Sequence, residues 1–497
     1  MSATLGLLGA GWRLLRADAL LPRELDPQLP AGARLAARLL RLPAGREARR
    51  GRPGERLARS LEALGPVSIK LGQFLSTRAD VFGETFASDL ARLKDRLPPF
   101  PTEQARAEVA AALDAPFDSV FTAFEPPVAA ASLAQAHRAQ MADGRSVAVK
   151  VLRPGVERRV AREVAVMRKA ARLAARLVPA SRRLEPLAFT ETVARALAME
   201  LDMRLEAAGA SELGEVMARD DYMQAPEVVW EVVGKRVLAL TWAEGAALSD
   251  PATLALPGLD RAELANNLTR GFLAQALDHG VFHADLHEGN LFAAAPAQLT
   301  AVDFGIVGRL GPGERRYLAE ILWGFLQRDY RRVSEVHFQA GYVPGEHTVE
   351  DFAQALRAVG EPIFGRPASQ VSMGRLLAQL FEITALYDMR LRPELVLLQK
   401  TMVTVEGVAR RIDPEHDIWA AARPVVERWV RRELGPVAKA RDLAEEARRA
   451  LGGLSRMAEA PAQRAVVVEP ARSRAGWLAP LLAGAALALA LVALVTD

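Results

Sequence analysis

The sequence contains no cysteine, which excludes disulfide bonds, thiolate metal sites and a cysteine nucleophile. It also has little excess charge, because 64 lysines and arginines balance 60 acidic residues over 497 positions. A net charge of +4 is too small to indicate nucleic-acid binding. Its 50% of hydrophobic residues is ordinary for a folded chain and excludes wholesale disorder. The length suits two or three domains, or one large two-lobed domain.

The first 56 residues are rich in arginine and leucine. No basic region precedes the short apolar stretch at the start, so residues 1–56 do not resemble a secretory signal. Two interpretations stay open for this basic amphipathic segment. It lies on an anionic membrane surface, or it forms a solvated helix that packs on the main domain.

An uncharged apolar run closes the sequence, from Trp477 to Val495. Its length is close to the ~20 residues that a membrane-spanning helix needs. Arg472 and Arg474 lie just before it, so the positive-inside rule predicts an anchor over 475–497 with the large domain in the cytoplasm. Residues 453–474, which contain prolines and scattered arginines, predict a linker.

The middle of the chain predicts a small β-containing lobe followed by a larger helical lobe. A helical extension is expected over 57–118, and long helical patterns cover 157–178 and 188–218. Strands are expected at 120–124, 134–141, 146–152, 228–233 and 237–241. From about 260 onward the pattern is mostly helical. The expected N-lobe therefore covers 119–241 and the helical C-lobe 242–452.

Three motifs, in this order, resemble the catalytic elements of protein kinases. V-A-V-K, which ends at Lys150 in the second strand of a predicted hairpin, resembles the kinase strand whose lysine bonds the α and β phosphates of ATP. The segment 283–290 fits H-x-D-x-x-x-x-N, in which Asp285 would orient the proton of the attacking oxygen and Asn290 would hold Mg²⁺. D-F-G then begins at Asp303, which is placed to bind the same metal. Each match alone is common, but their order predicts a nucleotide site.

Two standard kinase features are missing. The turn before the lysine strand is rich in alanine, which disfavours the positive φ angles that the usual glycines permit. This turn is still the expected nucleotide-binding loop, formed by Val128, Ala129, Ala130, Ala131, Ser132, Leu133, Ala134, Gln135 and Ala136. No A-P-E motif follows D-F-G, and a helix is expected at about 314–326 instead. The segment that normally holds a protein substrate is therefore short or absent.

Further motifs resemble those of the UbiB/ABC1/ADCK family of atypical kinase-like proteins. Lys70-Leu71-Gly72-Gln73 resembles the family's K-x-G-Q motif, and residues 129–132 resemble its alanine-rich loop. Glu200-Leu201-Asp202 resembles its E-x-D motif. The resemblance covers roughly residues 55–415. One departure is Glu288, where the family usually has proline within the catalytic loop.

The resemblance implies a kinase-like α+β fold, with an N-terminal helical extension, and roles for further residues. Glu206 would pair with Lys150, as the αC glutamate does in kinases, and so support the nucleotide. Lys70 would reach Glu200 or Asp202 and so dock a regulatory lid over the place of a peptide substrate. Gly72 and Gln73 belong to the same lid. Spacing independently predicts that Asp202 and Glu206, four residues apart on a helix, share a face, while Glu200 points elsewhere.

The resemblance also implies Mg²⁺-dependent ATP binding, with hydrolysis or phosphoryl transfer that supports ubiquinone biosynthesis at the bacterial inner membrane. The expected partners are membrane lipid, polyprenylated quinone precursors and other ubiquinone biosynthesis enzymes. Three alternatives stay open: a small-molecule phosphotransferase like aminoglycoside and choline kinases, a true protein kinase, and a scaffold that binds nucleotide and lipid without catalysis. The phosphoryl acceptor, the lipid ligand and the oligomeric state stay unassigned.

Overall fold

The computed structural model describes the central part of the chain. The described residues are 13–14, 16–19, 23, 51–76, 84–91, 93, 98–113, 115–177, 185–362, 383, 386–389 and 393–435. Most of the segment 1–56, the linker 453–474 and the expected anchor at 475–497 lie outside them. Within these described ranges, no helix is long and apolar enough to cross a membrane. The chain divides into two compact units, Met1–Arg432 and Glu433–Asp497, and the first is described below.

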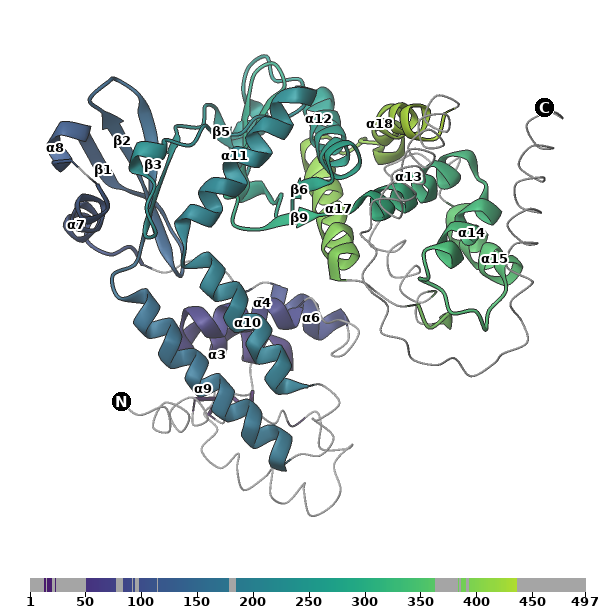
Figure 1. Ribbon diagram of the computed structural model, residues 1–497, viewed down its shortest axis with the longest axis horizontal. Coiled ribbons are helices and arrows are strands. Elements are labelled where there is room, and N and C mark those ends of the chain that lie inside the picture. The colour runs from purple at the N-terminus through teal and green to yellow at the C-terminus, as the bar shows by residue number, and fades with distance from the viewer. Residues whose placement is uncertain are drawn as a thin grey trace, which may run out of the picture. The chain divides into compact units, whose positions relative to one another are not determined.

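A four-stranded antiparallel sheet in the order β1-β2-β3-β4 forms the first lobe (Figure 1). Its strands are β1 (Phe121–Ala130), β2 (Ala134–Met141), β3 (Ser146–Leu152) and β4 (Val237–Thr241). Val147, Val149 and Val151 of β3 are fully buried in one cluster with residues of helix α7 (Thr102–Ala112). Because side chains alternate along a strand, Lys150 lies on the opposite face of the sheet from this core.

Two expectations for this lobe need correction. The turn expected over 128–136 is mostly strand, because β1 continues to Ala130 and β2 begins at Ala134. The strand expected over 228–233 is instead one bridge, Val228 with Leu240, followed by the 3₁₀ turn Trp230–Val232. The valines at 229 and 232 are both buried, which is the spacing of a helical turn rather than the alternation of a strand.

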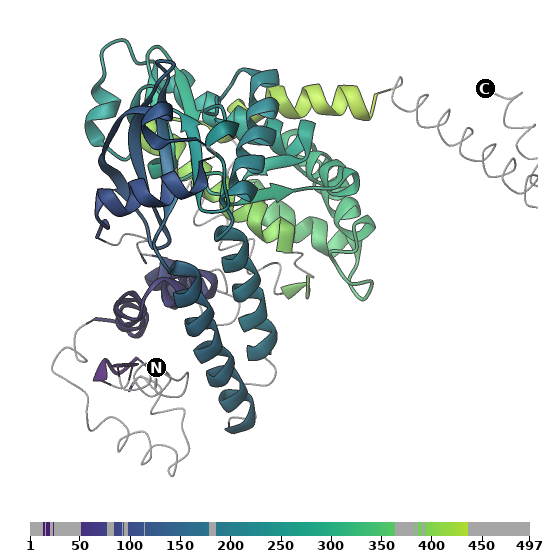
Figure 2. The ribbon, with the colours of Figure 1, turned by 60° about the vertical axis from the view of Figure 1, so that its left-hand side comes forward.

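Helices α9 (Val156–Leu177) and α10 (Pro186–Glu200) pack against each other and against α4 (Pro66–Ser76) of the helical extension, as both views show (Figures 1 and 2). The extension contains α3 (Pro53–Leu64), α4 (Pro66–Ser76) and α6 (Glu84–Ala91). They are followed by α8 (Phe117–Val120), α9 (Val156–Leu177), α10 (Pro186–Glu200) and α11 (Met203–Asp220).

The single helix expected over 188–218 is in fact two helices. α10 ends at Glu200, and α11 begins after Asp202, whose side chain accepts a hydrogen bond from the Arg204 amide as an N-cap. Asp202 has extended backbone angles, φ −123° and ψ 94°, so it is not inside a helix. The shared helical face expected for Asp202 and Glu206 was therefore wrong.

Two small sheets of the second lobe present the catalytic segments. They are β5-β7-β8 and β6-β9, and the strands are β5 (Ala246–Ala247), β6 (Val281–His283), β7 (Leu291–Ala294), β8 (Gln298–Ala301) and β9 (Val307–Arg309). The H-x-D loop joins β6 to β7, and D-F-G joins β8 to β9. The helices are α12 (Arg261–Ala274), α13 (Pro312–Gln327), α14 (Tyr330–Gln339), α15 (Val349–Gly360), α17 (Pro393–Ile412) and α18 (Ile418–Glu433).

His337 makes the stability of the α14–α15 region depend on pH. Its ring packs 5.2 Å from that of Phe352, and burial lowers the pKa of His337 to about 4. The unfolded chain binds a proton below pH ~6.5, whereas the folded chain does so only near pH 4. Stability is therefore complete above about pH 6.5, and we expect it to fall by about 3 kcal/mol as the pH drops to 4.

Urea unfolding at several pH values measures this loss. His337→Phe keeps the ring packing and removes the titrating group, so its free energy of unfolding should fall less on acidification. Equal acid sensitivity in the variant and the wild type would contradict the assignment to His337.

Candidate nucleotide site

Lys150 lies at the centre of a cluster of charged side chains. Its Nζ donates to both carboxylate oxygens of Glu206, at 2.7 and 2.9 Å, and to Oδ1 of Asp303, at 3.2 Å. The three residues come from β3, α11 and the segment after β8. The structure thus brings together residues that the sequence analysis had placed in one site.

The charges in this cluster act on one another. The Lys150 ammonium holds the pKa of Asp303 well below its usual range. Burial opposes the charge on Lys150, but the carboxylates of Asp303 and Glu206 outweigh it and raise the pKa of Lys150. Burial raises the pKa of Glu206 to about 7, against the opposite effect of Lys150. At neutral pH, Lys150 and Asp303 are therefore both charged, as phosphate and metal binding require.

Asp303 has a backbone conformation that is rare for a residue with a side chain. Its φ of +65° lies in the left-handed region, which costs energy and persists only where the surroundings fix it. Both neighbours are fixed here: Phe304 is buried, and the Val302 carbonyl accepts a hydrogen bond from His283 Nε2 at 3.1 Å. The strained backbone therefore belongs to the residue that contacts Lys150.

His283 organises the catalytic loop through both of its ring nitrogens. Nε2 donates to Val302, and Nδ1 accepts the Asp285 amide hydrogen at 3.1 Å, so the proton is assigned to Nε2. Burial lowers the pKa of His283 and so favours this neutral form. The sequence analysis gave His283 no role, although its place in H-x-D was the available signal.

Asn290 and Asp303 form the pair that could hold a metal ion. Asn290 Nδ2 donates to the Asp285 carbonyl at 3.0 Å, and the Asn290 carbonyl accepts from the Val302 amide at 2.9 Å. The side-chain oxygen of Asn290 is therefore the atom suited to a metal. In the part of the chain that the structure describes, no three histidine or acidic residues could form a metal site together. The oxygen pair fits Mg²⁺, which takes its remaining ligands from phosphates and water.

The alanine-rich turn offers mainly backbone and small side chains to a ligand. Ala136 pairs with Lys150 across β2 and β3, whereas Ser132, Leu133, Ala134 and Gln135 are buried. The Gln135 amide group accepts from the Phe100 amide at 2.9 Å and donates to the Phe100 carbonyl at 3.1 Å. Its side chain therefore contacts the segment before α7. Val128 and Ala129 are exposed on β1, and Ala130 and Ala131 are half-buried.

The structure shows which of the two acids expected to pair with Lys70 does so. Lys70 Nζ lies 3.1 Å from Glu200 Oε1, whereas Asp202 pairs with Arg204 at 2.7 Å. Electrostatic interactions with Lys150, then with His283 and last with Lys70, lower the pKa of Asp303.

The other two lid residues lie on α4 with Lys70. A Cβ at Gly72 would collide with the side chains of Leu93 and Leu61, so glycine allows α4 to pack against its neighbours in the extension. Gln73 is half-buried. The structure brings Glu200, but not Asp202, to this helix.

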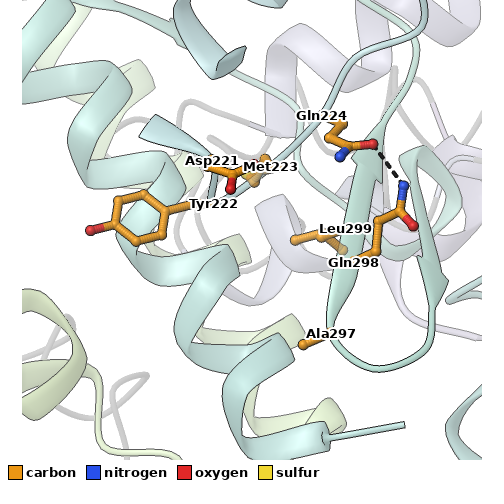
Figure 3. A pocket seen from close by; sticks show the side chains of 7 residues that line it. All are labelled: Asp221, Tyr222, Met223, Gln224, Ala297, Gln298 and Leu299. Carbon is orange, nitrogen blue, oxygen red and sulfur yellow. Dashed lines mark hydrogen bonds between the residues drawn. The ribbon is translucent and has the colours of Figure 1, made fainter. Parts of the chain in front are cut away.

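A separate cavity of about 260 Å³ lies between the end of α11 and the β7–β8 turn (Figure 3). It is lined by Asp221, Tyr222, Met223, Gln224, Ala297, Gln298 and Leu299. Gln298 Nε2 donates to Gln224 Oε1 at 2.7 Å on its wall. None of the expected site residues lines this cavity.

Two family models match the chain. The ABC1 atypical kinase-like domain matches residues 92–337, and the UbiB helical domain matches residues 356–417. Relatives named "Probable protein kinase UbiB" cover most of the chain as well. The protein belongs to the UbiB family. The UbiB relative from Marinobacter nauticus is 40% identical over 388 residues, which is 77% of this chain and 71% of the relative.

Other relatives and one solved structure agree. The UbiB relative from Pseudomonas aeruginosa strain UCBPP-PA14 is 38% identical over 450 residues, covering 87% of this chain and 84% of the relative. The solved complex of Rv3197 with erythromycin, from Mycobacterium tuberculosis, has a TM-score of 0.51 and 25% identity. The matched region covers 73% of this chain and 93% of the Rv3197 chain. The expected family and the kinase-like α+β fold are confirmed.

Proposed function

We propose that this UbiB-family protein binds Mg²⁺-ATP and turns it over as an atypical kinase or ATPase. The observation that carries the proposal is the position of Lys150, within hydrogen-bonding distance of both Glu206 and Asp303. Lys150 would bond phosphate oxygens, and Asp303 with Asn290 would hold Mg²⁺, which supplies charge neutralisation on the phosphates. Asp285 would accept the proton of the attacking oxygen.

The acceptor is water or a small or lipid-linked molecule rather than a protein segment. β9 ends at Arg309 and α13 begins at Pro312, so no A-P-E segment lies between D-F-G and this helix. The Lys70–Glu200 pair also joins the lid helix α4 to the end of α10, and α11, which carries Glu206, begins three residues later. Both features favour hydrolysis or transfer to a compact acceptor over a true protein kinase.

The biological role that we propose is support of ubiquinone biosynthesis. The family assignment and the bacterial UbiB relatives support it. ATP turnover would help to extract or present a polyprenylated quinone precursor to other enzymes of that synthesis. A membrane-bound position is consistent with such an insoluble precursor.

A deletion strain tests the role and the chemistry together. Wild-type protein should restore ubiquinone, whereas Asp285→Asn should not, and its ATP hydrolysis should fall by at least about a hundredfold. Asp388→Asn, a change at an aspartate side chain that is 80% exposed and outside the site, is the matched control. Full restoration by Asp285→Asn would favour the scaffold alternative. Turnover that requires a soluble alcohol would favour a small-molecule phosphotransferase.

We further propose that residues 475–497 anchor the protein in the bacterial inner membrane, with the catalytic domain in the cytoplasm. The uncharged run 477–495 and the arginines before it support this position. Truncation after Arg474 should therefore move the protein from the membrane fraction to the soluble fraction. If residues 1–56 also bind lipid, removal of both segments should be needed. Full-length protein in the soluble fraction would contradict the anchor.

A further inference from the structure

Helix α17 contacts the catalytic loop on both sides of Asp285. The hydroxyl of Thr401, which is only 1% exposed, lies 3.1 Å from the Ala284 carbonyl and 2.9 Å from the Leu397 carbonyl of its own helix, so its one proton is shared between the two acceptors. Arg411, nearer the end of the same helix, forms an ion pair with Glu288. Because Ala284 precedes Asp285 and Glu288 follows it, the two contacts restrain the loop at both ends.

α17 is itself held in place by α12, which packs alongside it (Figure 1). Arg261 Nε of α12 donates to the Ile412 carbonyl at the end of α17, at 2.5 Å. Just beyond that end, the buried His416 and Thr269 of α12 are joined by a hydrogen bond of 2.9 Å between Nε2 and Oγ1. The residues that reach the loop therefore project from a fixed helix.

The backbone at Glu288 would accept a proline, yet the chain has a glutamate there. Glu288 is the first residue of a 3₁₀ turn, a position that needs no helical amide bond. His287 before it has φ −85° and ψ 163°, which is the conformation that a following proline favours. A proline ring at this position would stiffen the catalytic loop. In this chain, the ion pair between Glu288 and Arg411 restrains the loop instead. The side chains of this pair are 41% and 31% exposed, so salt should weaken it.

We propose that α17 clamps the catalytic loop, with Thr401 and Arg411 as positioning residues for Asp285. The loop lies in the kinase-like domain and α17 in the UbiB helical domain, so the clamp makes the order of the loop depend on the helical domain. Its consequence for turnover rests on the proposed function, but its consequence for loop order does not.

Hydrogen exchange of loop peptides over 283–291 tests the clamp in the full-length protein without any nucleotide. Arg411→Ala and the isosteric Thr401→Val should each speed exchange there by about threefold, and Lys400→Ala, at an exposed position on the same helix, should not. In ATP hydrolysis, kcat should fall about fivefold, whereas KM for ATP should change less than about twofold.

Two combined variants separate positioning from general damage. Exchanging the charges, with Glu288→Arg and Arg411→Glu together, should restore most of kcat. With Glu288→Pro in place, adding Arg411→Ala should have no further effect, and the salt dependence of kcat should shrink.

Unchanged loop exchange in both Arg411→Ala and Thr401→Val would overturn the clamp, whether or not the wild type hydrolyses ATP. An undiminished effect of Arg411→Ala on top of Glu288→Pro would overturn the part played by the ion pair. Faster loop exchange in a protein with no ATP turnover would support the clamp and count against the proposed function.

Discussion

Replacing Asp303 with asparagine should abolish Mg²⁺-dependent ATP turnover. The substitution removes the charged oxygen that contacts Lys150 and that we propose as a metal ligand. The low pKa of Asp303, set mainly by Lys150, shows that the native site stabilises the ionised carboxylate. An amide cannot replace that charge beside Mg²⁺ and phosphates, so we expect a loss of at least about a hundredfold in kcat.

The substitution suits this test because the backbone should tolerate it. Asparagine adopts positive φ more readily than most residues, so it fits the +65° at this position. Thermal unfolding checks the fold, and titration of nucleotide with and without Mg²⁺ separates metal loss from nucleotide loss. Asp388→Asn again serves as the exposed control. Unchanged binding and unchanged hydrolysis in Asp303→Asn would remove the core of the proposed function.

Local patterns in the sequence predicted the parts of the site that are contiguous in the chain. The strand over 237–241 was predicted at the observed bounds, because an apolar run of this length between turns is too short for a typical helix. The helix after D-F-G was placed within two residues of its observed start at Pro312. The catalytic loop and D-F-G were identified because their residue types, at fixed spacing and in a fixed order, resemble kinase motifs.

Other features depend on tertiary contacts that a single sequence does not contain. The break between α10 and α11 was missed because Asp202 fits both a helical face and an N-cap. Glu200 and Asp202 were equally plausible partners for Lys70 until the end of α10 fixed which of them faces α4. Thr401 and Arg411 contact residues that lie 117 and 123 positions away in the sequence, and hydrophobic periodicity does not predict contacts between residues so far apart.

Removing Lys70 should loosen the lid and raise autophosphorylation. The Lys70 and Glu200 side chains are only 16% and 22% exposed, so their pair is screened less than a surface pair. Losing a partly buried pair of this kind costs ~1–3 kcal/mol, which corresponds to a shift of about 5- to 150-fold in the lid equilibrium. Lys70→Ala should therefore expose the cluster around Lys150 to larger acceptors, including the protein itself.

The pairing seen in the structure supplies matched variants for this test. Glu200→Gln should act like Lys70→Ala, because it breaks the same ion pair from the other side. Asp202→Asn should not act in this way, because Asp202 pairs with Arg204 and caps α11. Labelled ATP measures phosphate incorporation into each full-length protein, and nucleotide affinity is measured alongside. Negligible and equal labelling in the wild type, Lys70→Ala and Glu200→Gln, at unchanged affinity, would contradict a closed lid. That result would favour a dedicated ATPase or a scaffold, because opening the lid would then give no acceptor access to the γ-phosphate.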